Sequence, residues 1–97
     1  MATAAILRAL QIRVSGRVQG VSFRYYTREQ ALQEDLSGWV RNLANGDVDV
    51  WLQSDDEQAL ARMLQWLQHG PSLARVDRIE HSACAPDATL QGFEIRF

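Results

Sequence analysis

Apolar and polar residues alternate near the start of the chain. Leu10, Ile12 and Val14 are separated by single polar residues, and this period of two predicts a half-buried strand. Gly16 and Gly20 then bound a short segment whose glycines favour a loop. The sequence therefore predicts a strand that ends near Gly16 and runs into a glycine-bounded loop.

A helix is predicted directly after this loop. Ser22 is a residue type that commonly caps helix N-termini. Beyond it, residues suited to a buried face recur at helical spacing: Phe23, Tyr26 or Thr27, and Ala31. The helical pattern fades near Asp35, so we expect the helix to end there.

A second strand is predicted over residues 38–43, followed by a hairpin at Asn45 and Gly46. A two-residue loop would pair Val40 with Trp51, whereas a three-residue loop over 44–46, with Gly46 left-handed, pairs Val40 with Val50. We expect the second register, because it gathers aliphatic residues on one face and tryptophans on the other. The aliphatic face would hold Val40, Val48, Val50 and Leu52, and the opposite face would pair Trp39 with Trp51, as a cross-strand pair rather than an interaction patch.

A second helix follows the hairpin. Ser54 and Glu57 have the spacing of a capping box, and leucines and a methionine then repeat at helical spacing: Leu60, Met63, Leu64 and Leu67. Gly70 and Pro71 are expected to end this helix, with His69 in its last turn.

The rest of the chain predicts β-structure. Ala74, Val76 and Ile79 suggest a strand with one break of phase, and alternation predicts a last strand with Phe93, Ile95 and Phe97 on one side. Two β-α-β units around a hairpin predict the α+β ferredoxin-like (split βαβ) sandwich, an antiparallel sheet with two helices on one face.

Composition narrows the classes of function. The chain has 97 residues, 46% of them apolar, which fits one domain over residues 8–97 after a short N-terminal tail over residues 1–7. Ten arginines, no lysine and twelve acidic residues give a net charge of −2, so we expect no nucleic-acid partner and no membrane partner. Cys84 is the single cysteine and has no partner for a disulfide, so we expect a reducing compartment, the cytoplasm. We also expect a monomer.

Candidate chemistry gathers after the first two strands. A helix joins these strands, so they run parallel and their C-terminal ends share one edge of the sheet. The glycine-bounded loop, Arg24 in the first helical turn and Asn42 are therefore expected at one corner. Main-chain N–H groups at a helix N-terminus and an arginine can bind a phosphate-sized anion, although two glycines before a helix commonly form only a turn. His69 and His81 stand alone, so we expect no metal site.

Two segments carry a resemblance to a known family. The first is Gly16–Arg24, with the sequence GRVQGVSFR, and the second is Gly38–Asn42, GWVRN, followed by Gly46-Asp47-Val48. Together they resemble the two signature motifs of the acylphosphatase family, and the likeness extends from about residue 8 to the end of the chain. Ser54 departs from the pattern, because the second motif usually has a glycine there; we interpret Ser54 as the cap of the second helix.

The resemblance implies an acylphosphatase that hydrolyses the carboxyl–phosphate mixed anhydride of an acyl phosphate to a carboxylate and inorganic phosphate. Water would attack in line, without a metal, a cofactor or a covalent intermediate, and inorganic phosphate would be product and competitive inhibitor. The main-chain N–H groups that bind the phosphoryl group would come from Arg17, Val18, Gln19, Gly20 and Val21. The two catalytic residues would be Arg24, whose side chain also binds the phosphoryl group, and Asn42, which orients the water.

Three alternatives come from other classes. A non-catalytic ferredoxin-like module could use the same corner to bind an anion or a protein. An RNA-binding module of the RRM type needs aromatic residues in its central strands and a basic face, and residues 10–15 contain no aromatic residue. An acylphosphatase-like domain could also serve a larger maturation enzyme, although a sequence that ends at Phe97 favours a free-standing domain.

Overall fold

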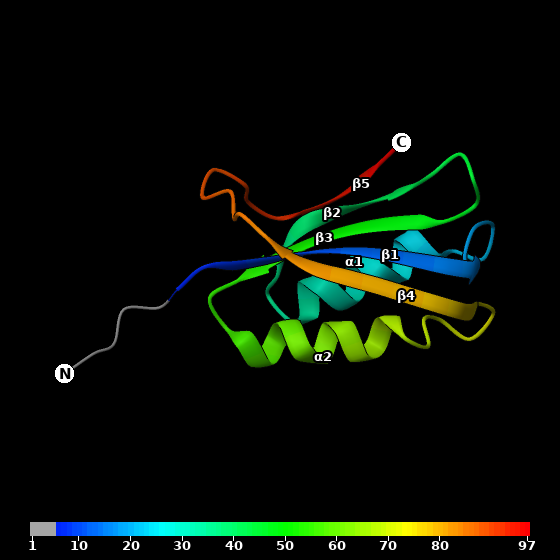
Figure 1. The fold of residues 1–97 in the computed structure, drawn as a ribbon, viewed down its shortest axis with the longest axis horizontal. Helices are drawn as coiled ribbons and strands as arrows, with labels where there is room; N and C mark the ends of the chain where they lie inside the picture. The colour runs from blue at the N-terminus through cyan, green and yellow to red at the C-terminus, as the bar shows by residue number, and fades with distance from the viewer. Residues whose placement is uncertain (1–5) are drawn as a thin grey trace.

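The computed structural model describes residues 6–97, so residues 1–5 of the predicted tail lie outside the described part. Seven helices and strands follow one another in the described chain (Figure 1). They are β1 (Arg8–Arg17), α1 (Phe23–Gln33), β2 (Ser37–Asn42), β3 (Val48–Ser54), α2 (Glu57–Leu67), β4 (Arg75–Cys84) and β5 (Phe93–Arg96).

The strands form one sheet in the order β4-β1-β3-β2-β5, and both helices cover the same face of it (Figure 1). This is the predicted ferredoxin-like α+β architecture. The prediction of an antiparallel sheet is right for β1 to β4 but wrong for β5, which pairs with β2 in parallel. The chain leaves β4 at one end of the sheet and turns back along the opposite, free edge, which gives β5 the direction of β2. The sheet is therefore mixed.

The β2–β3 hairpin has the predicted register. Val40 pairs with Val50, Asn42 pairs with Val48 and Trp39 lies opposite Trp51. Gly46 adopts a positive φ of 97°, as a three-residue loop requires. The valines at these positions are fully buried beneath the helices, so the aliphatic face forms the centre of the core.

The break of phase in β4 is a bulge. Ser15 pairs with Arg78 but Gly16 pairs with Val76, which leaves Asp77 as an extra residue on β4. Gly16 makes this possible, because a Cβ atom there would collide with the Arg75 carbonyl oxygen. The end of β1 therefore lies very close to the backbone of β4, and the loop after β1 starts from a fixed point.

The predicted side-chain cap of α1 is wrong. Ser22 is the N-cap residue, but it lies in the left-handed region at φ 59° and its side chain makes no capping hydrogen bond. Val21 and Phe23 on either side are both buried, and the turn that brings both inward gives Ser22 this conformation. The first turn of α1 therefore keeps N–H groups that no side chain of Ser22 satisfies.

The predicted capping box of α2 is also wrong. Ser54 still pairs with Arg8 at the end of β3, so α2 begins only after Asp56, whose carboxylate accepts hydrogen bonds from the N–H groups of Gln58 and Ala59 at 3.0 and 3.3 Å. The Ser54 hydroxyl instead accepts from the Asp56 N–H at 3.0 Å. At the other end, α2 stops at Leu67, so His69 lies beyond the helix and not in its last turn.

We expect Asp56→Ala to lower the free energy of unfolding by about 1 kcal/mol, because two helix N–H groups lose their acceptor. Ser54→Ala should cost clearly less, since its hydroxyl serves one N–H group outside the helix. Urea denaturation followed by circular dichroism measures both. Equal losses for the two variants would contradict the assignment of Asp56 as the cap.

Candidate active site

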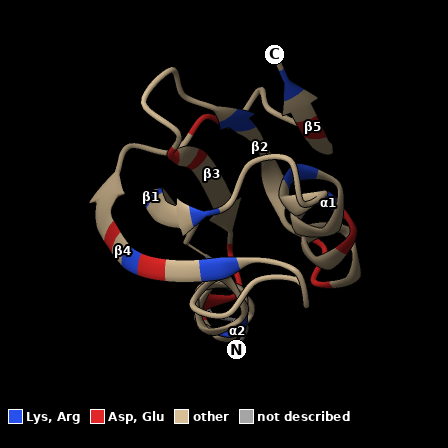
Figure 2. Ribbon diagram, turned by 90° about the vertical axis from the view of Figure 1, so that its right-hand side faces the viewer, with Lys and Arg blue, Asp and Glu red and all other residues tan. Residues whose placement is uncertain are grey.

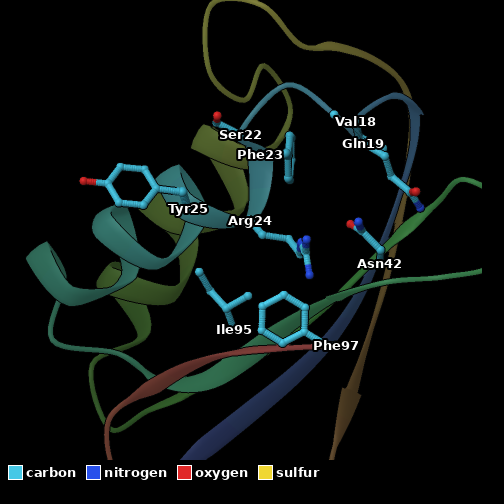
Figure 3. Close-up of a pocket in the computed structure, with 10 residues that line it drawn as sticks. Val18, Gln19, Ser22, Phe23, Arg24, Tyr25, Asn42, Ile95 and Phe97 are labelled. Atoms are coloured by element: carbon cyan, nitrogen blue, oxygen red, sulfur yellow. The ribbon is translucent and has the colours of Figure 1, made fainter.

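The loop after β1, the N-terminus of α1 and the end of β2 meet at one corner, as the sequence predicts (Figure 3). The residues there enclose a pocket of about 400 Å³. Its lining consists of Val18, Gln19, Gly20, Ser22, Phe23, Arg24, Tyr25, Asn42, Ile95 and Phe97. Three segments far apart in the sequence therefore build one site: residues 18–25 (which include the start of α1), the end of β2 and the end of the chain at β5.

Main-chain N–H groups are the first set of groups in this pocket that can bind a ligand. In the described part of the chain, none of those from residue 18 to residue 25 donates a hydrogen bond to another protein group. They lie in a segment where Gly20 and Ser22 have positive φ angles of 72° and 59°, and at the N-terminus of α1, where the helix dipole favours negative charge. This arrangement suits a bound anion.

The Arg24 side chain is the second group in the pocket that can bind a ligand. Among the residues that the structure describes, its guanidinium donates one hydrogen bond, from Nη1 to the Arg96 carbonyl oxygen at 3.3 Å, and it lies over the Phe97 ring at 4.8 Å from the ring centre. A guanidinium has five N–H donors, so the rest of the fork is free for an anion. Figure 3 shows the guanidinium of Arg24 pointing across the pocket toward Asn42.

The Asn42 side chain is the third group in the pocket that can bind a ligand. It ends β2, and its Oδ1 atom is buried with no hydrogen-bond partner among the described residues. A buried amide oxygen without a donor is costly, so this atom is suited to accept a hydrogen bond from a small molecule that enters the pocket. The amide nitrogen of the same side chain can donate at the same place.

The charge of the pocket is one-sided. Its ten lining residues include Arg24 but no Asp, Glu or His. Figure 2 shows further basic segments near the ends of β1 and β5, at the same end of the molecule. The pocket therefore favours an anion, and it offers no ordinary side-chain acid or base for proton transfer.

Five of the seven predicted site residues line the pocket: Val18, Gln19, Gly20, Arg24 and Asn42. Arg17 and Val21 do not. Arg17 still pairs with Arg75 at the end of β1, and the Val21 side chain is 7% exposed, within the core. Only main-chain N–H groups were assigned to these two residues, and that assignment stays a prediction.

The contribution of β5 to the pocket was not predicted from the sequence. Ile95 and Phe97 line the pocket because β5 runs parallel to β2 and ends at the same corner. The Phe97 side chain is fully exposed apart from its contact with Arg24. The alternation of Phe93, Ile95 and Phe97 did predict a strand, but alternation alone does not say which edge of the sheet the strand joins.

No group of three or more His, Cys, Asp or Glu residues among the described residues is placed to hold a metal ion. No helix among them is both long enough and apolar enough to cross a membrane.

The sequence and the fold of the chain match those of a known family. The acylphosphatase family model matches residues 10–95. A protein of Colwellia psychrerythraea named acylphosphatase is 53% identical over 68 residues, which are 70% of this chain and 75% of that protein. The crystal structure of acylphosphatase from Bacillus subtilis matches with a TM-score of 0.88 at 30% identity, over 95% of this chain and 100% of that chain.

A likeness to a much larger protein is also present. The crystal structure of HypF from T. kodakarensis matches with a TM-score of 0.81 at 30% identity, over 93% of this chain but 12% of that chain. The same small domain is thus found as part of a longer polypeptide.

The fold and the pocket define a small ferredoxin-like α+β domain with a pocket at the N-terminus of α1 that Arg24 lines. The chain belongs to the acylphosphatase family, and it is accordingly a hydrolase. The resemblance carried by Gly16–Arg24 and Gly38–Asn42 is confirmed.

Proposed function

We propose that this acylphosphatase hydrolyses small acyl phosphates by direct attack of water on phosphorus. The observation that carries the proposal is the meeting of unpaired main-chain N–H groups, Arg24 and Asn42 in one pocket. The N–H groups and the arginine suit the phosphoryl group of the substrate, and Asn42 suits the nucleophile. These are the two things that phosphoryl transfer asks of a protein: positioning and charge stabilisation.

The phosphoryl group would lie against the loop of residues 18–22, with main-chain N–H groups of residues 17–21 and the Arg24 guanidinium on its oxygens. Arginine can grip two phosphate oxygens at once, and the Arg96 carbonyl and the Phe97 ring hold its guanidinium toward the pocket. The negative charge that spreads over the phosphoryl oxygens in the transition state is then stabilised by groups already in place. The loop is in this sense a phosphate-binding loop.

Asn42 would orient the attacking water through its amide. The water oxygen forms a bond to phosphorus while the bond between phosphorus and the acyl oxygen breaks, and the carboxylate leaves with the bonding electron pair. A carboxylate is a good leaving group and needs little protonation. Because no Asp, Glu or His lines the pocket, the proton of the water would pass to an oxygen of the phosphoryl group itself.

A covalent route through Ser22 has less support. The Ser22 residue lines the pocket, but a serine hydroxyl needs an adjacent base to become a nucleophile, and none lines this pocket. Direct attack by water therefore fits the site better, because it needs no side-chain base. In this route inorganic phosphate is a product that occupies the same site, which makes it a competitive inhibitor.

We further propose that the protein acts as a monomer in the cytoplasm. A single free cysteine, Cys84, suits a reducing compartment. The likeness to part of HypF supports a different setting, in which such a domain is one part of a much longer chain.

One assay tests the main proposal. Purified protein is mixed with an aromatic acyl phosphate in excess EDTA, and release of phosphate is followed with and without added inorganic phosphate. We expect rapid turnover that EDTA does not reduce and that inorganic phosphate inhibits competitively. Folded protein that binds phosphate but releases none from the substrate would instead establish the non-catalytic, anion-binding module.

A further inference from the structure

The Gln19 side chain connects two parts of the site that the sheet does not connect. Its Nε2 atom donates hydrogen bonds to the carbonyl oxygens of Leu43 and Asp47, at 2.8 and 2.9 Å. Both partners are carbonyl oxygens, which only accept, so the side-chain nitrogen has to face them. Figure 3 shows the Gln19 side chain beside Asn42, on the hairpin side of the pocket.

The two carbonyl groups belong to the residues that close the β2–β3 hairpin. Leu43 N–H donates to the Asp47 carbonyl at 2.8 Å, and Gly46 N–H donates to the Leu43 carbonyl at 3.2 Å. Leu43 directly follows Asn42. A group that holds these carbonyls therefore holds the backbone from which the Asn42 side chain projects.

The loop of residues 18–22 is anchored in the core by Val18 and Val21, which are 1% and 7% exposed, but it makes few hydrogen bonds to the hairpin. Pairing of β1 with β3 stops at Val14 and Val48, four residues before the loop begins. In the described part of the chain, the two bonds from Gln19 are the only hydrogen bonds between residues 18–22 and the hairpin. The loop also contains Ser22 in a left-handed conformation, which an unrestrained serine disfavours. Its shape therefore depends on contacts made beyond β1.

We propose that Gln19 is a positioning residue that fixes the distance between the loop of residues 18–22 and Asn42. The inference rests on the proposed function, because that distance matters only if the loop holds a phosphoryl group and Asn42 holds its nucleophile. Water must approach phosphorus in line with the bond that breaks, and small errors of placement slow such reactions strongly. The role belongs to the Gln19 side chain and is separate from the main-chain N–H of the same residue.

A direct contact of this side chain with substrate fits the geometry less well. Both hydrogens of the amide nitrogen are engaged by the two carbonyl oxygens. What remains is the amide oxygen, which would repel a phosphate oxygen rather than bind it. Gln19 therefore acts through the backbone of the loop and of the hairpin.

The test compares Gln19→Met with Gln33→Met. Methionine keeps the length of the side chain and removes both donors, and Gln33 is an exposed residue at the end of α1, outside the pocket. We expect Gln19→Met to lower kcat by about tenfold and to raise the inhibition constant of inorganic phosphate about threefold. Gln33→Met should change neither by more than about twofold. Amide NMR spectra of each variant establish that it is folded.

A double-mutant cycle separates positioning from general stabilisation of the fold. If Gln19 sets the distance to Asn42, then Gln19→Met should lower kcat by less than about twofold in an Asn42→Ala background, because the partner to be positioned is gone. An equal loss of kcat in both backgrounds would overturn the inference. So would kcat and phosphate inhibition at wild-type values in folded Gln19→Met.

The same experiment distinguishes the two proposals. If the wild-type protein and Gln33→Met turn over substrate and Gln19→Met does so equally fast, the positioning role fails and the proposed function stands. If the wild-type protein shows no turnover, the proposed function fails. In that case, titration of wild-type and Gln19→Met protein with inorganic phosphate tests whether Gln19 holds the loop. Equal phosphate affinities of the two proteins would overturn the positioning role of Gln19 too.

Discussion

Asn42→Ala is expected to lower kcat by about 10²-fold or more, with little change in KM or in inhibition by inorganic phosphate. Asn42 lies across the pocket from Arg24 and carries the buried, unpartnered Oδ1 atom. Its loss removes the group that holds the nucleophile but leaves the groups that hold the phosphoryl oxygens. Steady-state kinetics with an aromatic acyl phosphate, together with phosphate inhibition, measures both effects.

A second substitution at this position sharpens the result. Asn42→Asp keeps the shape of the side chain but replaces the amide nitrogen with a second oxygen and adds a negative charge beside the phosphoryl site. It should therefore lower kcat and also raise the inhibition constant of phosphate. If Asn42→Ala instead weakened phosphate binding as strongly as it lowered kcat, Asn42 would be a phosphate ligand, and the proposed division of roles would be wrong.

The position of the candidate site at one corner of the sheet can be predicted from the sequence, because few features determine it. Alternation at Leu10, Ile12 and Val14 identifies β1, and the aliphatic face around Val40 and Val50 fixes the register of the hairpin. Once a helix joins β1 to β2, the two strands must run parallel, and the loop after β1 must lie near Asn42. Burial and connectivity alone are enough for these steps.

What the sequence did not reveal depends on details of side-chain and backbone geometry. Ser22 and Ser54 have the residue type of a cap, but backbone conformation at Ser22 and strand pairing at Ser54 decide against that role. The edge that β5 joins is set by the path of residues 85–92, which carries no periodic signal. The long-range bonds of Gln19 join residues 24 and 28 positions apart, and no local pattern points to them.

Arg24→Ala is expected to lower kcat/KM by about 10³-fold and to raise the inhibition constant of inorganic phosphate by about tenfold or more. Turnover and phosphate affinity should fall together, because the guanidinium would bind phosphoryl oxygens in the ground state and more strongly as charge develops. Arg28→Ala is the matched control: Arg28 lies one turn further along α1, outside the pocket, and pairs with Glu29 at 3.6 Å. Its kinetic constants should stay within about twofold of wild type.

Arg24→Lys separates charge from geometry at the same position. A lysine ammonium is a point charge without the planar fork, and it cannot reproduce both the hydrogen bond to the Arg96 carbonyl and a two-oxygen grip on phosphate. We therefore expect phosphate affinity to recover in part while kcat stays low, since affinity in the ground state needs charge and the transition state needs direction. Full recovery of kcat in Arg24→Lys would show that the pocket needs only a positive charge, and that the contacts of Arg24 with Arg96 and Phe97 do not position it for catalysis.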